Sequence, residues 1–246
     1  MQLLVCISKV PDTTTKIAFV ENNTKFSESG VQFIINPYDE WYALVRALEL
    51  KETLGGTVTV INCGKADNEQ IIRKALALGA DDAVRIDLDA SDAMQVAVNI
   101  AAFAREHTFD IILTGKETID YNGGVLGAML AELLDLPYIS LASKLEVQGD
   151  VVTAEREIEG VKEVVEGKMP CVISAQKGMA EARIPNMRGI LASKTKPLQV
   201  LPAVTAENTV HVNAFSLPAD KGGCKYVDPE NAGELITLLH SEAKVI

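Results

Sequence analysis

The chain has 246 residues, of which 48% are hydrophobic, and carries a formal net charge of -11. This length can bury a core without disulfides. The acidic surplus opposes binding to nucleic acid or to acidic membranes, whose phosphates attract clustered Lys and Arg. No apolar run approaches the roughly 20 residues of a membrane span, and no basic leader precedes the first strand-like run. We therefore expect a cytoplasmic protein with no membrane span and no nucleic-acid partner.

The cysteines and histidines carry no pattern of a metal or catalytic site. The cysteines are scattered and include no C-x-x-C pair: Cys6, Cys63, Cys171 and Cys224. Reduced thiols of a cytosolic protein fit this spacing best. No Ser-His-Asp or metal-ligand spacing links the three histidines. We expect no metal and no independent catalysis, so a bound cofactor would supply any chemistry.

The first half of the chain alternates strand-like and helical patterns. Residues 1–8 form the first predicted strand. A helix of about four turns follows over residues 36–56 and ends at Gly55 and Gly56. Its expected apolar face comprises Trp41, Leu44, Val45, Leu48 and Leu54. Such alternation is typical of parallel strands joined by crossover helices.

Further units continue this pattern. A buried strand over residues 57–64 precedes a helix that stops near Gly79 and another strand. Ser91 or Asp92 is the expected N-cap of the next helix, and "FDIILTG" is the strand after it. Beyond Pro137, apolar and polar residues alternate around two glycine-containing turns, which predicts antiparallel strands at the sheet edge.

The last third of the sequence is less regular. Residues 178–228 show little regular structure and are rich in Pro, Lys and Gly. Such a long loop is unusual unless it packs against something else. An amphipathic helix closes the chain, with Asp228 as its cap and Pro229 at its first position. The fold class that we predict is α/β: a doubly wound, mainly parallel sheet with adenine-nucleotide-binding topology, antiparallel edge strands and an extended C-terminal arm.

The turn in "LTGKETIDYNGGVLGAMLAE", residues 113–132, joins a strand to a helix. Gly123, Gly124, Val125 and Leu126 would present free N–H groups at the helix N-terminus, which attracts anions. Glycine also allows positive φ and close approach of a ligand. G-G-x-x-G is nevertheless neither a P-loop nor a Rossmann fingerprint. The turn alone favours phosphate binding and a plain tight turn about equally.

Other strand ends strengthen the case for a nucleotide. In a doubly wound sheet the ligand lies beyond the carboxyl ends of the strands. Cys6, residues 36–39 and Cys63 are expected there, and small or amide side chains suit an adenine ring and a ribose. Taken singly, each cysteine is better explained as a buried small residue and Asn36 as a turn residue. Together they predict an adenine-nucleotide site.

Several ordered segments resemble one family, the beta subunit of electron transfer flavoproteins. They include "LLVCISKVPD", "INPYDEWYALVRALELKE", "IIRKALALGADDAVRI" and the turn itself. The most specific is "AEREIEGVKEVVEGKMPCVISAQKG", which looks like the family's signature segment, and "EARIPNMRGILASKTKPLQVL" resembles its recognition loop. The resemblance covers almost the whole chain.

This resemblance implies a heterodimer in which the alpha subunit carries most of the FAD and this chain holds AMP. Electrons would pass from acyl-CoA or other dehydrogenases to a membrane quinone reductase, the electron transfer flavoprotein–quinone oxidoreductase. The implied cofactor-binding residues are Cys6, Asn36, Pro37, Tyr38, Asp39, Cys63, Gly115, Asp120, Asn122, Gly123, Gly124, Val125 and Leu126.

The turn departs from the family pattern. Many relatives carry Asn-Gln-Thr-Gly where this chain has Gly124-Val125-Leu126-Gly127, so a phosphate would rely on backbone N–H groups and Asn122. Electron-bifurcating relatives place a second FAD in this pocket, and the same could hold for this chain. An ATP-binding stress-type α/β protein is an alternative from another class, but it would require a longer glycine-rich phosphate loop or an S-G-G-x-D-S motif, and neither appears. A third alternative is a scaffold whose pocket is empty.

Partner docking is implied for "RIPNMR". Ile184 matches the family's anchoring aliphatic residue, which docks into a pocket on dehydrogenases. The implied docking residues are Arg183, Ile184, Pro185, Asn186, Met187 and Arg188. From the residues alone, Ile184 as a satellite of the core is the simpler interpretation. We accordingly divide the chain into a nucleotide-binding domain (1–177), a recognition loop with a partner-embracing arm (178–228), and a C-terminal helix (229–246).

Overall fold

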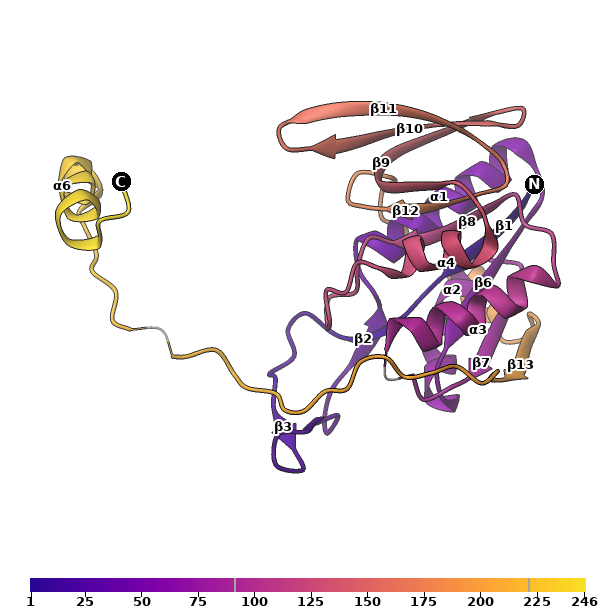
Figure 1. Ribbon diagram of the computed structural model, residues 1–246, viewed down its shortest axis with the longest axis horizontal. Coiled ribbons are helices and arrows are strands. Elements are labelled where there is room, and N and C mark those ends of the chain that lie inside the picture. Colours follow the sequence, from indigo (N-terminus) through magenta and orange to yellow (C-terminus); the bar gives the residue numbers. More distant parts are fainter. Residues whose placement is uncertain (91, 221) are drawn as a thin grey trace.

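The computed structural model describes residues 1–90, 92–220 and 222–246. Its main feature is a central sheet flanked by helices (Figure 1), as the predicted α/β fold class requires. Within the described residues the sheet has nine strands. These are β1 (Gln2–Cys6), β6 (Thr57–Cys63), β7 (Asp82–Asp87), β8 (Ile111–Gly115), β9 (Tyr138–Gln148), β10 (Val151–Ile158), β11 (Val161–Lys168), β12 (Cys171–Ala175) and β13 (Leu198–Pro202).

The strand order confirms a doubly wound sheet. It runs β11-β10-β9-β12-β8-β1-β6-β7-β13. All neighbours from β9 to β13 are parallel, whereas β10 and β11 form the antiparallel edge that the alternating pattern predicts. The first strand lies between β6 and β8, so the strand order reverses there. The carboxyl ends of β1 and β8 therefore flank the position where such sheets bind ligands.

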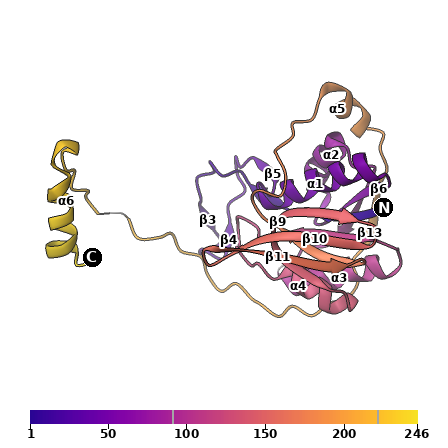
Figure 2. The ribbon, with the colours of Figure 1, turned by 90° about the horizontal axis from the view of Figure 1, so that it is seen from above.

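Helices cover both faces of the sheet (Figure 2). The helices of the body are α1 (Asp39–Leu54), α2 (Glu69–Leu78), α3 (Ala93–Arg105), α4 (Leu126–Leu134) and α5 (Met187–Ser193), with the short turn η1 (Ala66–Asn68). The remaining helical elements, η2 (Pro229–Asn231), α6 (Ala232–Leu238) and η3 (Leu239–Ala243), lie at the C-terminal end of the chain. Alternate residues of β1 point to opposite faces: Leu3 packs with α1 and α2, and Leu4 with α3 and α4. Both faces of β1 are consequently buried, as expected for a parallel sheet.

Two small ladders follow β1, in a region for which the sequence pattern predicts no element. Strand β2 (Lys9–Pro11) pairs with β5 (Phe33–Ile35), and β3 (Phe19–Val20) pairs with β4 (Lys25–Phe26). Both pairings are antiparallel and short. They form a projection beside the main sheet (Figure 1).

Helix boundaries agree well with the predicted stop signals. Gly55 and Gly56 end α1 with φ of 76° and 117°, and a Cβ on Gly56 would lie 1.8 Å from the Met1 carbonyl oxygen. Only glycine fits there. Gly79 ends α2 with φ 139°. The prediction that Leu54 joins the buried face of α1 is wrong, because its side chain is exposed at the last turn of the helix.

The N-cap of α3 is one of the two predicted candidates. The Asp92 carboxylate accepts a hydrogen bond from the Gln95 N–H at 2.8 Å. This bond satisfies one of the free donors of the first helical turn. The other candidate, Ser91, lies outside the described residues.

The expectation of little regular structure over residues 178–228 is wrong for its first part. Helix α5 packs against α2, and β13 pairs with β7 in parallel as the outer strand of the main sheet. Pro202 ends β13, and a strand with prolines at its ends fits only a sheet edge. These elements are too short for the spacing of apolar residues to show whether they are helix or strand. Residue 221 of this segment lies outside the described residues.

The C-terminal helix stands apart from the body at the end of an extended arm (Figures 1 and 2). No residue of η2, α6 or η3 is buried, and Ile236 on α6 is exposed. Asp228 caps η2 and Pro229 is its first residue, as the sequence predicts. Across the described residues, the helices are all too short or too polar to cross a membrane.

Candidate functional site

A glutamate side chain occupies the space between the carboxyl ends of β1 and β8. Glu40, on the first turn of α1, accepts hydrogen bonds from the Ser8 N–H at 2.5 Å and from the Ser8 Oγ at 2.7 Å. A Cβ on Gly115, at the end of β8, would lie 2.7 Å from the Cγ of Glu40. Gly115 is therefore needed for the close approach of α1 to β8.

Glu40 is a buried acid with an unusual proton affinity. Its side chain is 2% exposed. Burial raises the pKa of Glu40 to about 8, the negative charges of Asp120 and Asp39 act in the same direction, and the hydrogen bonds from Ser8 oppose the shift. Burial therefore favours the protonated form of this carboxyl group, whereas the two hydrogen bonds from Ser8 favour the ionised form.

The buried amide of Asn36 fixes the loop that follows β8. Its Nδ2 donates to the Glu117 carbonyl at 2.8 Å, and its Oδ1 accepts from the Ile119 N–H at 3.0 Å. Asn36 is 0% exposed. The structure therefore brings together two segments that are far apart in sequence, residues 36–39 and the turn. The Asn36 amide holds that turn and is engaged on both sides.

Tyr38 has a strained backbone beside this loop. Its φ is 64° and its ψ is -78°, and the Asp39 N–H donates to the Pro37 carbonyl at 2.8 Å. This three-residue γ-turn with positive φ is rare for a residue with a side chain. The ring of Tyr38 is exposed and lies 6.3 Å from the ring of Tyr42. An exposed aromatic ring at a strained position is a feature of ligand sites.

Residues 116–126, for which the sequence predicts phosphate binding and which we therefore call the nucleotide turn, lead into α4 without a side-chain cap. Val125 is the N-cap residue, and its side chain cannot accept a hydrogen bond. Asn122 and Gly124 adopt positive φ of 49° and 63°. Within the described part of the chain, no group accepts a hydrogen bond from the N–H groups of Gly123 to Ala128. These N–H groups at the positive end of α4 are available to an anion.

A buried hydroxyl lies under the first turn of α4. The Oγ1 of Thr114 has no hydrogen-bond partner among the residues that the structure describes, and Thr114 is 0% exposed. A Cβ on Gly127 would lie 3.0 Å from this oxygen and 2.8 Å from the ring of Tyr138. Gly127 consequently brings the helix N-terminus close to β8 and leaves no space for a larger residue.

The charges around the nucleotide turn are mostly acidic. Lys116 pairs with Glu117 at 2.9 Å. This hydrogen bond raises the pKa of Lys116, to which Asp39 adds an attractive charge. Burial raises the pKa of Asp39. A phosphate at this turn would thus depend on the backbone N–H groups, because the neighbouring lysine is already paired.

The predicted cofactor residues Cys6 and Cys63 have thiols that burial keeps neutral. Cys6 and Cys63 end the adjacent parallel strands β1 and β6. Burial raises the pKa of Cys6 well above its ordinary value and that of Cys63 to about 12. Neither thiol ionises at neutral pH, so neither is a nucleophile or a thiolate ligand. Among the described residues, no cluster of His, Cys, Asp and Glu could hold a metal ion.

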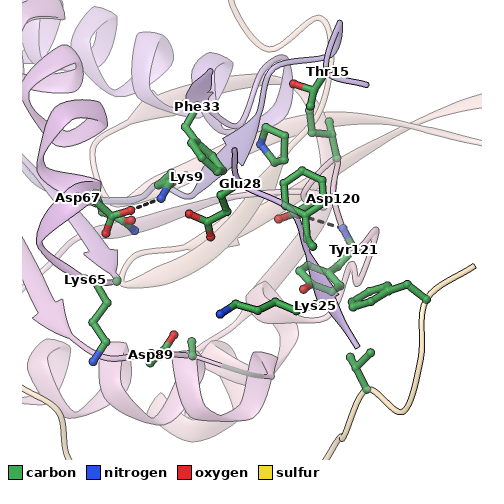
Figure 3. Close-up of a pocket in the computed structure, with 18 of the residues that line it drawn as sticks. Lys9, Thr15, Lys25, Glu28, Phe33, Lys65, Asp67, Asp89, Asp120 and Tyr121 are labelled. Atoms are coloured by element: carbon green, nitrogen blue, oxygen red, sulfur yellow. Dashed lines mark hydrogen bonds and ion pairs between the residues drawn. The ribbon is translucent and has the colours of Figure 1, made fainter. Parts of the chain in front are cut away.

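A cavity of about 1130 Å³ lies beside the turn (Figure 3). Its walls come from the N-terminal projection, the loops after β6 and β7, residues 119–121 and the start of the C-terminal arm. In its wall, Lys9 pairs with Asp67 (Figure 3), and the Lys9 Nζ lies 3.9 Å from the ring centre of Phe33. Of the predicted cofactor residues, Cys63 and Asp120 line this cavity, whereas Cys6, residues 36–39, Gly115 and residues 122–126 lie outside its lining.

Sequence reasoning missed several residues that build the site. Asn62 donates to the Ile7 carbonyl at 2.8 Å and accepts from the Asn68 amide at 2.9 Å. Asn62 could have been recognised as a polar residue within an apolar, buried strand, because a buried amide requires hydrogen-bond partners. Glu40 and Ser8 gave no such signal, because an acid in the first turn of a helix is common on any protein surface.

The predicted docking residues form an exposed but anchored segment. Ile184 is 91% exposed and Met187 is 72% exposed. Arg183 forms a two-pronged ion pair with Glu52 on α1, at 2.7 and 2.9 Å. The Asn186 side chain caps α5 by accepting from the Gly189 N–H at 2.8 Å. The simpler interpretation of Ile184 as a satellite of the core does not fit its exposure.

Comparisons with known proteins place this geometry in one family. The model of the family "Electron transfer flavoprotein domain" matches residues 23–206. Electron transfer flavoprotein subunit beta of Bacillus subtilis (strain 168) is 38% identical, over 100% of this chain and 100% of that protein. The subunit of the same name from Syntrophomonas wolfei is 36% identical, over 93% of this chain and 90% of that protein. That of Sus scrofa is 34% identical, over 82% of each chain. The chain belongs to the family of electron transfer flavoprotein beta subunits.

Proposed function

We propose that this chain is the beta subunit of a heterodimeric carrier that moves electrons from acyl-CoA or other dehydrogenases to an electron transfer flavoprotein–quinone oxidoreductase. The proposal rests chiefly on Ile184, an almost fully exposed aliphatic side chain on an anchored segment. An exposed apolar residue at the centre of an ordered surface is a common anchor of protein complexes. The carrier acts in the cytoplasm, and this chain contributes no catalytic group.

The nucleotide turn binds the phosphate of AMP in this proposal. Its support is the set of free N–H groups at the start of α4 and the buried, unpartnered hydroxyl of Thr114 in the described part of the chain. Gly124 has positive φ, and the space at its Cβ position is open, since the nearest atom there is the Lys116 carbonyl oxygen at 3.7 Å. The backbone N–H groups of the turn would bind the phosphate, and the hydrogen bonds of the Asn36 amide would fix the conformation of the turn. The residues present therefore fit a phosphate monoester.

The alpha subunit is proposed to cover the arm and the C-terminal helix and to hold most of the FAD. In α6 the apolar side chains of Leu235 and Ile236 are 47% and 61% exposed. Such a helix gains stability only when a second surface covers its apolar face. The flavin supplies the redox chemistry once bound. The residues of this chain would bind and orient it and would exclude water.

The cavity favours a second candidate, an electron-bifurcating beta subunit with a second FAD in place of AMP. Its volume of about 1130 Å³ exceeds what a mononucleotide fills. Known pockets for small molecules measure roughly 300 to 1,000 Å³. Aromatic residues Phe33 and Tyr121 line the cavity beside the turn. A flavin ring could lie there while its AMP half occupies the turn.

One experiment separates these candidates. The heterodimer, co-expressed with an alpha subunit, is denatured, and the released nucleotides are identified by chromatography. The proposed function predicts one FAD and one AMP per heterodimer. Two FAD molecules would favour the bifurcating subunit, whereas one FAD without AMP would reject the nucleotide site. A preparation without flavin would reject the carrier function itself.

A further inference from the structure

The segment that exposes Ile184 is fixed on both sides. On its N-terminal side, Arg183 Nη1 and Nη2 donate to the two carboxylate oxygens of Glu52 at 2.7 and 2.9 Å, and Glu49 lies 3.9 Å from Nη2. On its C-terminal side, Asn186 caps α5. Only Ile184 and Pro185 separate these anchors. The exposed side chain therefore stands on a short span with little freedom.

Helix α5 is itself held on α2 by reciprocal capping of helix ends. Arg73 on α2 donates to the carbonyls of Ser193 and Lys196 at 2.7 and 2.8 Å. Lys196 donates in return to the carbonyls of Leu76, at 3.0 Å, and Ala80. Cations at the carboxyl ends of helices are stabilising, because the last carbonyls there lack partners.

The contact between α5 and α2 is also close in space. A Cβ on Gly189 would lie 2.2 Å from the Ala77 carbonyl oxygen. Glycine is thus required for α5 to reach α2. The C-terminal anchor of the segment is therefore part of the body, and the ion pair of Arg183 ties its other end to α1.

We propose that Arg183 and Glu52 are a positioning pair that holds Ile184 in its docking orientation. This inference rests on the proposed docking function of Ile184. The hydrogen bond from Arg183 also lowers the pKa of Glu52, so the pair stays charged over the physiological range. A planar guanidinium fixed by both carboxylate oxygens restricts the backbone more than a single contact does. Arg183 thus acts within the chain, whereas the family resemblance assigns it to the partner interface.

Charge exchange provides the test. In the co-expressed heterodimer, Arg183→Glu places an acid beside Glu52 and Glu49, and Glu52→Arg places a second cation beside Arg183. Each single variant should raise the half-saturating dehydrogenase concentration by up to about fivefold, the upper end of what an exposed ion pair contributes. The rate at saturating dehydrogenase and the flavin content should stay unchanged. The double variant should recover most of the loss, with Glu49 limiting full recovery.

A control variant distinguishes orientation from net charge. Lys177 is exposed and forms no ion pair with any residue that the structure describes. Lys177→Glu therefore changes the net charge by the same amount as Arg183→Glu without breaking an ion pair. It should leave half-saturation unchanged. Two outcomes would overturn the proposal. One is that Lys177→Glu raises the half-saturating dehydrogenase concentration as much as Arg183→Glu does. The other is that the double variant docks as weakly as the weaker single variant, because Arg183 would then act on the partner directly.

A second readout is independent of the partner. Amide hydrogen exchange of residues 183–190 should become faster in each single variant and slower again in the double variant. Unchanged exchange in the single variants would also overturn the positioning role. Ile184→Ala separates the two proposals. If it leaves docking unaffected, while amide hydrogen exchange still becomes faster in the single charge variants and slower in the double variant, the docking function is rejected and the positioning role of Arg183 and Glu52 is retained.

Discussion

The nucleotide turn and the docking segment, residues 183–188, differ in which kind of side chain is buried. At the carboxyl edge of the sheet, polar groups such as Glu40 and Asn36 are buried and hydrogen-bonded. In the docking segment, the apolar side chain of Ile184 is exposed, while Arg183 and Asn186 on either side of it form hydrogen bonds. Both arrangements cost stability by themselves, and both are fixed by contacts to α1. This comparison indicates that α1 is the common frame of the two regions for which we propose functions.

The largest expected effect concerns the turn. Gly124→Asp places a carboxylate beside the bound phosphate, where like charges at about 4 Å near a protein surface repel by roughly 4 kcal/mol. Nucleotide binding should be abolished while docking is kept. Nucleotide content of the purified heterodimer measures this. Gly149→Asp is the matched control, because Gly149 has the same φ of 63° and open space around its Cβ position. Retention of nucleotide at full stoichiometry in Gly124→Asp would place the pocket elsewhere.

The second prediction concerns the buried acid. The pKa of Glu40 is raised from 4.5 to about 8 in the folded state. The protonated form therefore stabilises the fold fully below pH 4.5, and this contribution is lost as the pH rises toward 8, by up to about 1.4 kcal/mol per pH unit. Glu40→Gln should flatten the dependence of unfolding free energy on pH between these values. Parallel curves for the two proteins would show that Glu40 does not keep its proton.

The third prediction concerns the exposed anchor. Ile184→Ala should weaken docking to the dehydrogenase by roughly 1 to 3 kcal/mol and leave the flavin content unchanged. Electron transfer should fall at low dehydrogenase concentration and recover as that concentration is raised. Titration with the dehydrogenase measures the half-saturation point, and Ile184→Leu, which keeps an aliphatic side chain, should lie close to the wild type. An unmoved half-saturation point would remove Ile184 from the interface, and lost flavin would make it a structural residue.

The smallest expected effect concerns the cap of α5. Asn186→Ala removes the hydrogen bond to the Gly189 N–H, which should cost about 1 kcal/mol of local helix stability. Amide exchange in residues 187–193 should become faster. Asn186→Asp should keep the protection, since its carboxylate accepts the same bond. Equal exchange in Asn186→Ala and the wild type would mean that packing on α2 alone holds the helix.

The helix ends and the antiparallel strands could be predicted from the sequence because their signals are local. Gly79 and the Gly55-Gly56 pair end helices by conformation, and the alternating residues beyond Pro137 pair as antiparallel strands. Strand β13 was missed because a five-residue run flanked by prolines resembles a loop. Its partner β7 supplies the pairing that its own sequence cannot indicate.

The parts that could not be predicted depend on distant pairs. Arg183 and Glu52 are 131 positions apart, and Asn36 reaches the Ile119 N–H across 83 positions. The sequence around Arg183 and around Asn36 contains no pattern that indicates the distant partner. The sequence predicted that residues 36–39 and the turn belong to one site, but not that Asn36 binds the turn itself.

Assembly with an alpha subunit tests the central claim most directly. The chain expressed alone and the chain co-expressed with an alpha subunit are compared by gel filtration with simultaneous recording of flavin absorbance. We expect the isolated chain to be poorly behaved, because the apolar side chains of α6 are exposed, and the co-expressed chains to elute as a 1:1 heterodimer with flavin. A stable, monodisperse monomer that ignores the alpha subunit and lacks flavin would contradict the account.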